Sequence, residues 1–243
     1  IHRKIKKTYV VVAGYHRECF GGGELSYYGT ATALPNIHFR LAATSVGDYA
    51  LFCVNTSVYA YNKSLTQSTP TGLPSTNNAI STSVGDYALF CASKNVYAYN
   101  KSLTQSTPTA LSVSRGDDQA ATSVGDYALF GGGSSGNLTI DAYDKSLTRS
   151  TPAALSIGRY GLAATFVGDY ALFGGGANTS VAGKYLGTVD AYNKALTRST
   201  PTELSVGRFY LAATSVGDYA LFGGGCNNRD NSLSVNTVDA YNK

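Results

Sequence analysis

One nonapeptide, Thr-Ser-Val-Gly-Asp-Tyr-Ala-Leu-Phe, starts at residues 44, 82, 122 and 214, and a variant with Phe in place of Ser starts at residue 165. Five copies in 243 residues constrain the fold more than any other feature of the chain. Their spacing of 38 to 49 residues is the length of one supersecondary unit. We therefore expect a repeat architecture in which neighbouring copies pack against one another.

Each unit contains four strand signals, and residues 196–243 show all four types. This stretch begins with the fourth strand of one copy and continues with the first three strands of the next. Leu-Ala-Ala-Thr-Ser-Val is short and partly β-branched, Gly-Asp is a two-residue hairpin turn, and Tyr-Ala-Leu-Phe is the second strand. Three glycines and a variable stretch follow, and Val-Asp-Ala-Tyr then predicts a third strand. Leu-Thr-Arg-Ser-Thr-Pro predicts a thin, polar fourth strand that proline ends, as on an exposed edge.

A four-stranded unit of this kind has apolar residues on both faces and is too small to bury them alone. Radial repetition gives each sheet a neighbour on either side, which is the architecture of a β-propeller. A β-solenoid is the alternative, but its coils normally keep a tighter period. The composition agrees with a soluble, all-β chain, because it has 27 glycines, 19 tyrosines, only 14% charged residues and no apolar run long enough to span a membrane.

An aromatic strand that ends in a glycine doublet, followed by a variable loop and then Val-Asp-x-Tyr, resembles the kelch motif. The resemblance covers nearly the whole chain and implies a propeller of four-stranded blades that binds its partners on one rim. The sequence departs from the kelch pattern in two ways. It has no tryptophan, and Cys53 and Cys91 stand where the first glycine is expected.

A sixth, divergent copy opens the chain. Thr-Tyr-Val-Val-Val-Ala-Gly matches a first strand, residues 19–23 (Cys-Phe-Gly-Gly-Gly) match Leu-Phe-Gly-Gly-Gly, and residues 29–35 match the region after a fourth strand. The last copy stops at Lys243 before its fourth strand, so either residues 1–7 close the ring late or the chain continues. We predict a single propeller domain over residues 1–243, with six blades over about 8–35, 41–73, 79–111, 119–155, 162–204 and 211–243.

Little in the sequence points to catalysis. His2, His16 and His38 have no partners at metal-ligand spacing, and no nucleophile-elbow, zinc-protease or phosphate-loop motif is present. Four basic residues within positions 3–7 account for the whole net charge of +4, so the rest of the chain lacks the charge of a nucleic-acid binder. We expect no enzymatic activity, no cofactor or metal, no nucleic-acid partner and no membrane insertion.

Three aspartates, Asp141, Asp190 and Asp239, recur at one position of the third strand, where Tyr59 and Tyr97 stand in two other copies. We expect these carboxylates to pair with backbone amides or with a neighbouring blade, with ion binding as the alternative. We also expect Cys53 and Cys91 to be free thiols, because neighbouring blades splay apart and a disulfide tolerates only about 7 Å between Cα atoms.

The contrast between constant turns and variable loops points to a binding surface. The loops after the second strand are short in the two copies that start at residues 44 and 82, and long in the last three. They emerge on the same rim as the linkers between blades, which would give a lopsided pocket. The candidate ligand-binding residues of this rim are Arg115, Arg159, Tyr160, Arg208, Phe209 and Tyr210 from the linkers, and Lys184, Tyr185 and Arg229 from the long loops.

An arginine beside an aromatic ring offers a bidentate fork and a stacking surface together, which suits an acidic peptide or an anionic or planar sugar. The sequence therefore predicts a non-enzymatic binding module for a protein or glycan, placed outside the cell or on its surface, with a cytoplasmic location as the alternative. A structural repeat segment of a longer adhesin or fibre protein is the second interpretation, and a carbohydrate-active or oxidase-type enzyme is the third.

Overall fold

The computed structural model describes residues 8–12, 15–19, 27, 29–35, 41–74, 79–178, 180, 185–227 and 234–243. The chain divides into two compact units, Ile1–Ala33 and Leu34–Lys243. The first unit contains one antiparallel hairpin, formed by β1 (Thr8–Val12) and β2 (Tyr15–Cys19). In this hairpin Val12 lies opposite Tyr15 and Thr8 lies opposite Cys19.

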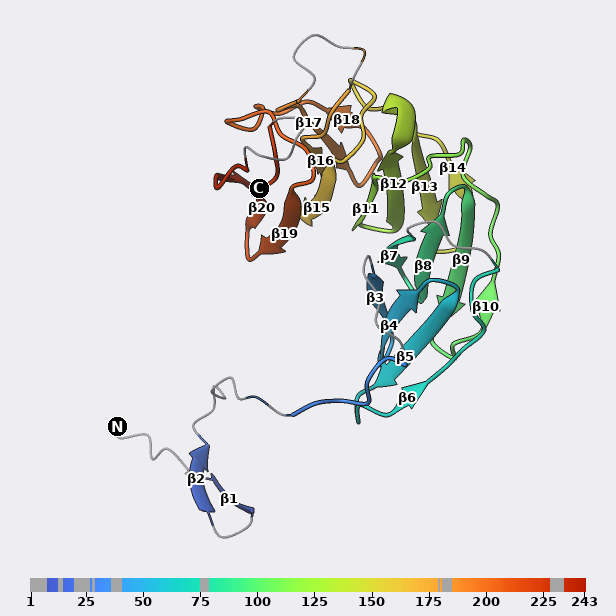
Figure 1. Ribbon diagram of the computed structural model, residues 1–243, viewed down its shortest axis with the longest axis vertical. Coiled ribbons are helices and arrows are strands. Elements are labelled where there is room, and N and C mark those ends of the chain that lie inside the picture. Colours follow the sequence, from blue (N-terminus) through green and yellow to red (C-terminus); the bar gives the residue numbers. More distant parts are fainter. Residues whose placement is uncertain are drawn as a thin grey trace. The chain divides into compact units, whose positions relative to one another are not determined.

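The second unit consists of five antiparallel sheets in sequence order, which we call sheets 1 to 5 (Figure 1). Sheet 1 is β3 (Ala42–Val46), β4 (Tyr49–Val54), β5 (Ser57–Asn62) and β6 (Gln67–Ser68). Sheet 2 is β7 (Ile80–Val84), β8 (Tyr87–Ala92), β9 (Asn95–Asn100) and β10 (Gln105–Ser106). Sheet 3 is β11 (Gln119–Val124), β12 (Tyr127–Gly132), β13 (Ile140–Asp144) and β14 (Arg149–Ser150), with the short 3₁₀ helix η1 (Ser134–Gly136) after β12. Sheet 4 is β15 (Ala163–Val167), β16 (Tyr170–Gly174), β17 (Val189–Asn193) and β18 (Arg198–Ser199). Sheet 5 is β19 (Ala212–Val216), β20 (Tyr219–Gly223) and β21 (Val238–Asn242).

The repeated hairpin forms as its sequence predicts. Val46 lies opposite Tyr49 across Gly47 and Asp48, and Gly47 has a φ of 53°. A positive φ at the first turn residue suits glycine and matches the twist of the two flanking strands. The same register recurs in every sheet of the second unit, and the fourth strand is only two residues long wherever it is present. The prediction of all-β repeats is confirmed, with four strands in sheets 1 to 4 and three in sheet 5, while closure into a six-bladed propeller stays a prediction.

Consecutive sheets of the second unit pack face to face. Their first strands contact one another in the order β3, β7, β11, β15 and β19. Each of four hydrophobic clusters draws its residues from two consecutive sheets, so the core is a series of equivalent interfaces. A fully buried phenylalanine of the second strand enters each interface from the later sheet, as Phe173 does between sheets 3 and 4.

The first glycine of the Gly-Gly-Gly runs in sheets 3 and 4 makes room for this phenylalanine. A Cβ atom on Gly131 would lie 3.0 Å from Cε1 of Phe173, and one on Gly174 would lie 2.7 Å from Cε1 of Phe222. The register places Cys53 and Cys91 at the same position in sheets 1 and 2. Both cysteines are buried and free, as expected from the sequence.

Candidate binding site

The three linker arginines are buried, although we expected them to present their guanidinium groups on a rim. Arg115, Arg159 and Arg208 are all 0% exposed. Nη2 of Arg159 lies 2.8 Å from Oδ2 of Asp190 and donates to the carbonyl oxygen of Phe173 at 3.0 Å. Nη1 of the same arginine donates to the carbonyl oxygen of Ile157 at 2.9 Å. The aspartate on the third strand of the same sheet draws each arginine inward, and a role for these arginines in ligand binding stays a prediction.

The aspartates pair with backbone amides, which confirms the expectation for these carboxylates. The amide of Ser156 donates to Oδ1 of Asp190 at 3.0 Å, and the hydroxyl of Ser156 donates to Oδ2 at 3.1 Å. Nη1 of Arg198, on the fourth strand, adds a further ion pair at 3.0 Å. Asp141 and Asp239 repeat this arrangement with Arg115 at 2.5 Å and Arg208 at 2.7 Å. Buried charges that are paired and hydrogen-bonded in this way hold the linker against its own sheet.

Burial and pairing shift the pKa values of these groups in ways that follow from their contacts. Burial lowers the pKa of Arg159 below its ordinary value, and the nearby charge of Asp190 opposes this shift. For Asp239, burial by itself raises the pKa, but hydrogen bonds from Ser205 and Arg208 outweigh burial and leave the pKa below 3.8. The lowered pKa of Asp239 keeps this carboxylate in the charged form that pairs with Arg208.

The sequence contains a signal for these pairs that our sequence analysis missed. An arginine stands four residues before the first strand wherever an aspartate stands on the third strand. In sheets 1 and 2 that position holds His38 and Thr76, and the third strand carries tyrosine instead. The fourth strand changes as well, from arginine to a glutamine that donates to a tyrosine hydroxyl, as Gln105 does to Tyr99 at 2.6 Å. Residues that change together between copies of one repeat are in contact.

Four of the predicted site residues come together in a cluster that we call the aromatic shelf: Tyr160, Tyr185, Phe209 and Tyr210. The rings of Tyr185 and Phe209 are stacked with centroids 5.3 Å apart, and Tyr160 meets Phe209 edge-on at 6.4 Å. Phe209 is only 6% exposed and lies 4.5 Å from the ring of Tyr210, which is 49% exposed. The shelf therefore has a buried centre and an exposed ring. Lys184 and Arg229, the other two predicted residues, lie outside the described residues.

A ladder of backbone hydrogen bonds supports the shelf. The amide of Tyr210 donates to the carbonyl oxygen of Gly161 at 2.7 Å, and the amide of Gly161 donates to that of Asp118 at 2.9 Å. These three residues occupy the same place in successive linkers, with φ values of 52°, 63° and 62°. Because this left-handed region disfavours residues with a Cβ, Tyr210 is held in a strained conformation.

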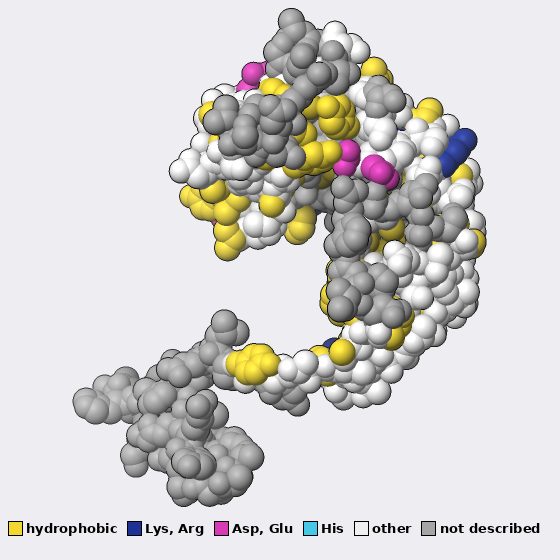
Figure 2. Space-filling model, viewed as in Figure 1, with side chains coloured by type: hydrophobic (Ala, Val, Ile, Leu, Met, Phe, Trp, Pro, Cys, Tyr) yellow, Lys and Arg dark blue, Asp and Glu magenta, His cyan; other side chains and the backbone are white. Residues whose placement is uncertain are grey.

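An acidic side chain, that of Asp118, contacts the aromatic shelf, and sequence analysis did not single it out. The hydroxyl of Tyr210 donates to Oδ2 of Asp118 at 3.0 Å. Asp117 and Asp118 are both partly exposed. Figure 2 shows acidic side chains next to hydrophobic ones on one face of the second unit. Within the described part of the chain, a carboxylate therefore contacts the shelf, whereas we expected guanidinium groups there.

The turns at the opposite end of the sheets are uniform. Each turn aspartate pairs with a lysine of its own sheet, as Asp169 does with Lys194 at 2.6 Å. All five pairs are well exposed, so each contributes little to stability. In sheets 2 to 5 the methylene groups of this lysine also lie against the turn glycine of the preceding sheet. The turn end of the sheets is the same in sheets 1 to 5. The sequence differences between copies that a specific binding site needs are found at the end that carries the aromatic shelf.

Among the described residues, no three or more His, Cys, Asp or Glu side chains gather closely enough to hold a metal ion. No helix in the described part of the chain is long and apolar enough to cross a membrane. No protein-family model matches the sequence, and no curated protein matches it either.

Proposed function

We propose that this chain is a non-enzymatic binding module that uses the aromatic shelf and Asp117 and Asp118 to bind a basic segment of a partner protein. The observation that carries the proposal is Tyr210. Its ring is half exposed, its backbone lies in the left-handed region, and its hydroxyl reaches Asp118. Backbone strain of this kind occurs at functional sites, and Tyr210 combines it with an exposed ring and a carboxylate partner.

The ligand class follows from the charge and the rings together. A lysine or arginine side chain is attracted to the face of a tyrosine ring and to a carboxylate, and both lie within one surface here. Aromatic side chains at the centre of a contact also contribute most of the binding energy in many protein interfaces. An acidic ligand is disfavoured because the guanidinium groups of Arg115, Arg159 and Arg208 are buried and already paired.

We further propose that the sheets are blades of a six-bladed, kelch-like propeller, with the N-terminal hairpin as the sixth copy. Val216 and Val238 of sheet 5 are 62% and 61% exposed, whereas Val167 and Val189, their counterparts in sheet 4, are 3% and 0% exposed. Sheet 5 thus has one apolar face that a further blade would cover. The hairpin β1–β2 has the strand register of the other copies, with Val12 opposite Tyr15 as Val46 is opposite Tyr49.

A selection of displayed random peptides on the full chain tests the binding proposal. We expect enrichment of peptides rich in lysine and arginine, since these complement the rings and the carboxylates of the shelf. Enrichment of acidic peptides would instead support binding through the arginines and refute this assignment. A parallel glycan array distinguishes a sugar ligand, and failure of both screens would favour a structural repeat segment.

A further inference from the structure

The most exposed ring of the aromatic shelf, that of Tyr210, is fixed at both ends. Its hydroxyl donates to Oδ2 of Asp118 at 3.0 Å, and its amide donates to the carbonyl oxygen of Gly161 at 2.7 Å. The ring crosses Gly161 so closely that a Cβ atom added there would lie 3.2 Å from Cδ1 and Cε1 of Tyr210. The ring centroid of Phe209, 4.5 Å away, supports it from within the shelf. The ring is therefore held in place without a ligand.

The carboxylate partner of Tyr210 belongs to a segment that is held by several hydrogen bonds. The carbonyl oxygen of Asp118 accepts from the amide of Gly161 at 2.9 Å. The amide of Asp117 donates to Oγ of Ser134 at 3.1 Å, and the amide of Ser134 donates to the carbonyl oxygen of Asp117 at 3.0 Å. The hydroxyl of Tyr210 uses one of the roughly four acceptor sites of a carboxylate. Because Asp118 is partly exposed, its carboxylate can accept further N–H donors from a ligand.

The hydroxyl contact places the carboxylate of Asp118 at the edge of the Tyr210 ring and not over its face. A cation that stacks on this ring therefore meets the carboxylate beside it. A guanidinium group is planar, stacks on aromatic faces and directs its N–H donors outward, so it can contact the ring and the carboxylate together. An ammonium group is a compact, strongly hydrated charge with diverging donors, so it reaches the carboxylate fully only by giving up contact with the ring face.

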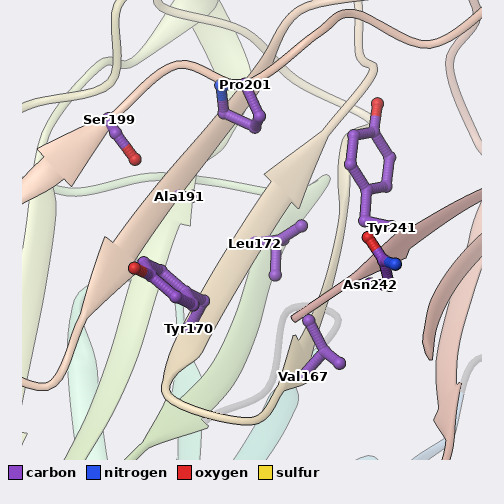
Figure 3. Close-up of a pocket in the computed structure, with 8 residues that line it drawn as sticks. All are labelled: Val167, Tyr170, Leu172, Ala191, Ser199, Pro201, Tyr241 and Asn242. Atoms are coloured by element: carbon purple, nitrogen blue, oxygen red, sulfur yellow. The ribbon is translucent and has the colours of Figure 1, made fainter. Parts of the chain in front are cut away.

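A second tyrosine of similar exposure has different neighbours. Tyr170 is 42% exposed, against 49% for Tyr210. Figure 3 shows Tyr170 with the other residues that line a pocket of about 220 Å³, which are Val167, Leu172, Ala191, Ser199, Pro201, Tyr241 and Asn242. None of these lining residues is acidic, and Asp169, the neighbour of Tyr170 in the sequence, pairs with Lys194 at 2.6 Å. Tyr170 is therefore a matched control for an exposed ring that has no carboxylate at its edge.

We infer that the aromatic shelf selects arginine over lysine, with the guanidinium group of the partner stacked on Tyr210 and donating to Asp118. This inference rests on the proposed function and narrows its ligand from a basic segment to one that places an arginine at the centre of the contact. Tyr210 supplies the stacking surface and Asp118 the counter-charge, so these two residues determine the specificity. Phe209, which is only 6% exposed, backs the ring and joins the contact to the core.

The test uses the full 243-residue chain and three fluorescent peptides, each with three repeats of Gly-X-Ser, in which X is arginine, lysine or citrulline. Citrulline keeps the planar shape of arginine but carries no charge. Fluorescence anisotropy on titration with the protein gives the three affinities. We expect the arginine peptide to bind about fivefold more tightly than the lysine peptide or better, because it alone makes the stacking and carboxylate contacts together. The citrulline peptide should bind most weakly.

Three variants of the protein, each checked by its unfolding temperature, locate the preference. Tyr210→Leu removes the ring with a residue that this chain already places in the left-handed region at Leu103 and Leu147, and it should bring the arginine and lysine affinities within about twofold of each other. Asp118→Asn keeps an acceptor for the hydroxyl of Tyr210 but loses the charge, so it should weaken the arginine peptide by about tenfold. Tyr170→Leu, the matched control, should leave all three affinities unchanged.

Each outcome has one reading. An arginine preference that is lost in Tyr210→Leu and kept in Tyr170→Leu supports the inference. Equal binding of the arginine and lysine peptides, weakened in Tyr210→Leu, overturns the selectivity and leaves the proposed binding of a basic segment standing. A preference that survives Tyr210→Leu also overturns the inference. If neither peptide binds at millimolar concentration, the proposed function fails and the inference fails with it.

Discussion

Replacing Asp190 by asparagine should destabilise the protein strongly, although the two side chains have nearly the same shape. Asp190 is fully buried and pairs with Arg159 at 2.8 Å and with Arg198 at 3.0 Å. The variant Asp190→Asn leaves the guanidinium group of Arg159 buried without a counter-charge. Removing one partner of a buried ion pair costs about 3–5 kcal/mol.

Differential scanning calorimetry gives the assay. In a chain of this size each 1 kcal/mol corresponds to about 2–4 °C, so the unfolding temperature of Asp190→Asn should fall by roughly 6–20 °C. The matched control is Asp144→Asn, the same chemical change at a partly exposed turn position. Asn62, Asn100 and Asn193 already serve there, so Asp144→Asn should stay within about 0.5 kcal/mol of the parent.

A double-mutant cycle tests the reasoning further. The double variant Arg159→Leu/Asp190→Leu should lose less free energy of unfolding than the sum of the losses in the two single variants. Each single variant leaves one buried charge without its partner, whereas the double variant removes both charges of the pair. If Asp190→Asn proved as stable as Asp144→Asn, or if the cycle were additive, the buried pair would not hold the linker and the explanation for the arginines would be wrong.

Three further predictions concern the core. Gly174→Ala should cost about 1–3 kcal/mol in chemical denaturation, because its Cβ would lie 2.7 Å from Phe222, and adding Phe222→Leu should recover part of the loss. Cys53 and Cys91, whose pKa values burial raises from 9.0 to about 11 and about 12, should resist iodoacetamide at pH 8 in the native state and react once the protein is unfolded. The free energy of unfolding should fall as pH rises from 9 towards 11, since the unfolded chain then ionises these thiols and also Tyr99, whose pKa burial raises from 10.0 to about 12. The fall should be shallower in Cys53→Ala/Cys91→Ala, and an unchanged slope in that variant would exclude the thiols as a cause.

The strands and turns were predictable because their signals are local. Alternating apolar residues and a Gly-Asp pair define the hairpin in every copy, and five nearly identical copies reinforce one another. The thin fourth strand was predictable for the same reason, because a proline stands two residues after it. Aspartate pairing with a backbone amide also followed from its regular place on the third strand.

The position of the arginines was not predicted, because it depends on contacts between segments that are distant in the sequence. Arg159 is 31 residues before Asp190, and the linker sequence by itself does not indicate that its arginine pairs with a buried carboxylate of the following sheet. Comparing copies would have shown it, since the arginine and the aspartate are present together or absent together. The acidic neighbours of the shelf were missed because Asp118 meets Tyr210 only through the packing of sheets 3, 4 and 5.

The most direct test of the proposed function is the affinity of Tyr210→Gly for the best basic peptide from the selection. Gly161 holds the same left-handed place in the preceding linker, so glycine fits this backbone and relieves a strain of about 1–2 kcal/mol. The unfolding temperature should therefore change little, while the loss of an exposed aromatic ring at the centre of a contact should weaken binding by about tenfold or more. An unchanged affinity in a stable Tyr210→Gly variant would contradict the assignment of the aromatic shelf as the binding site.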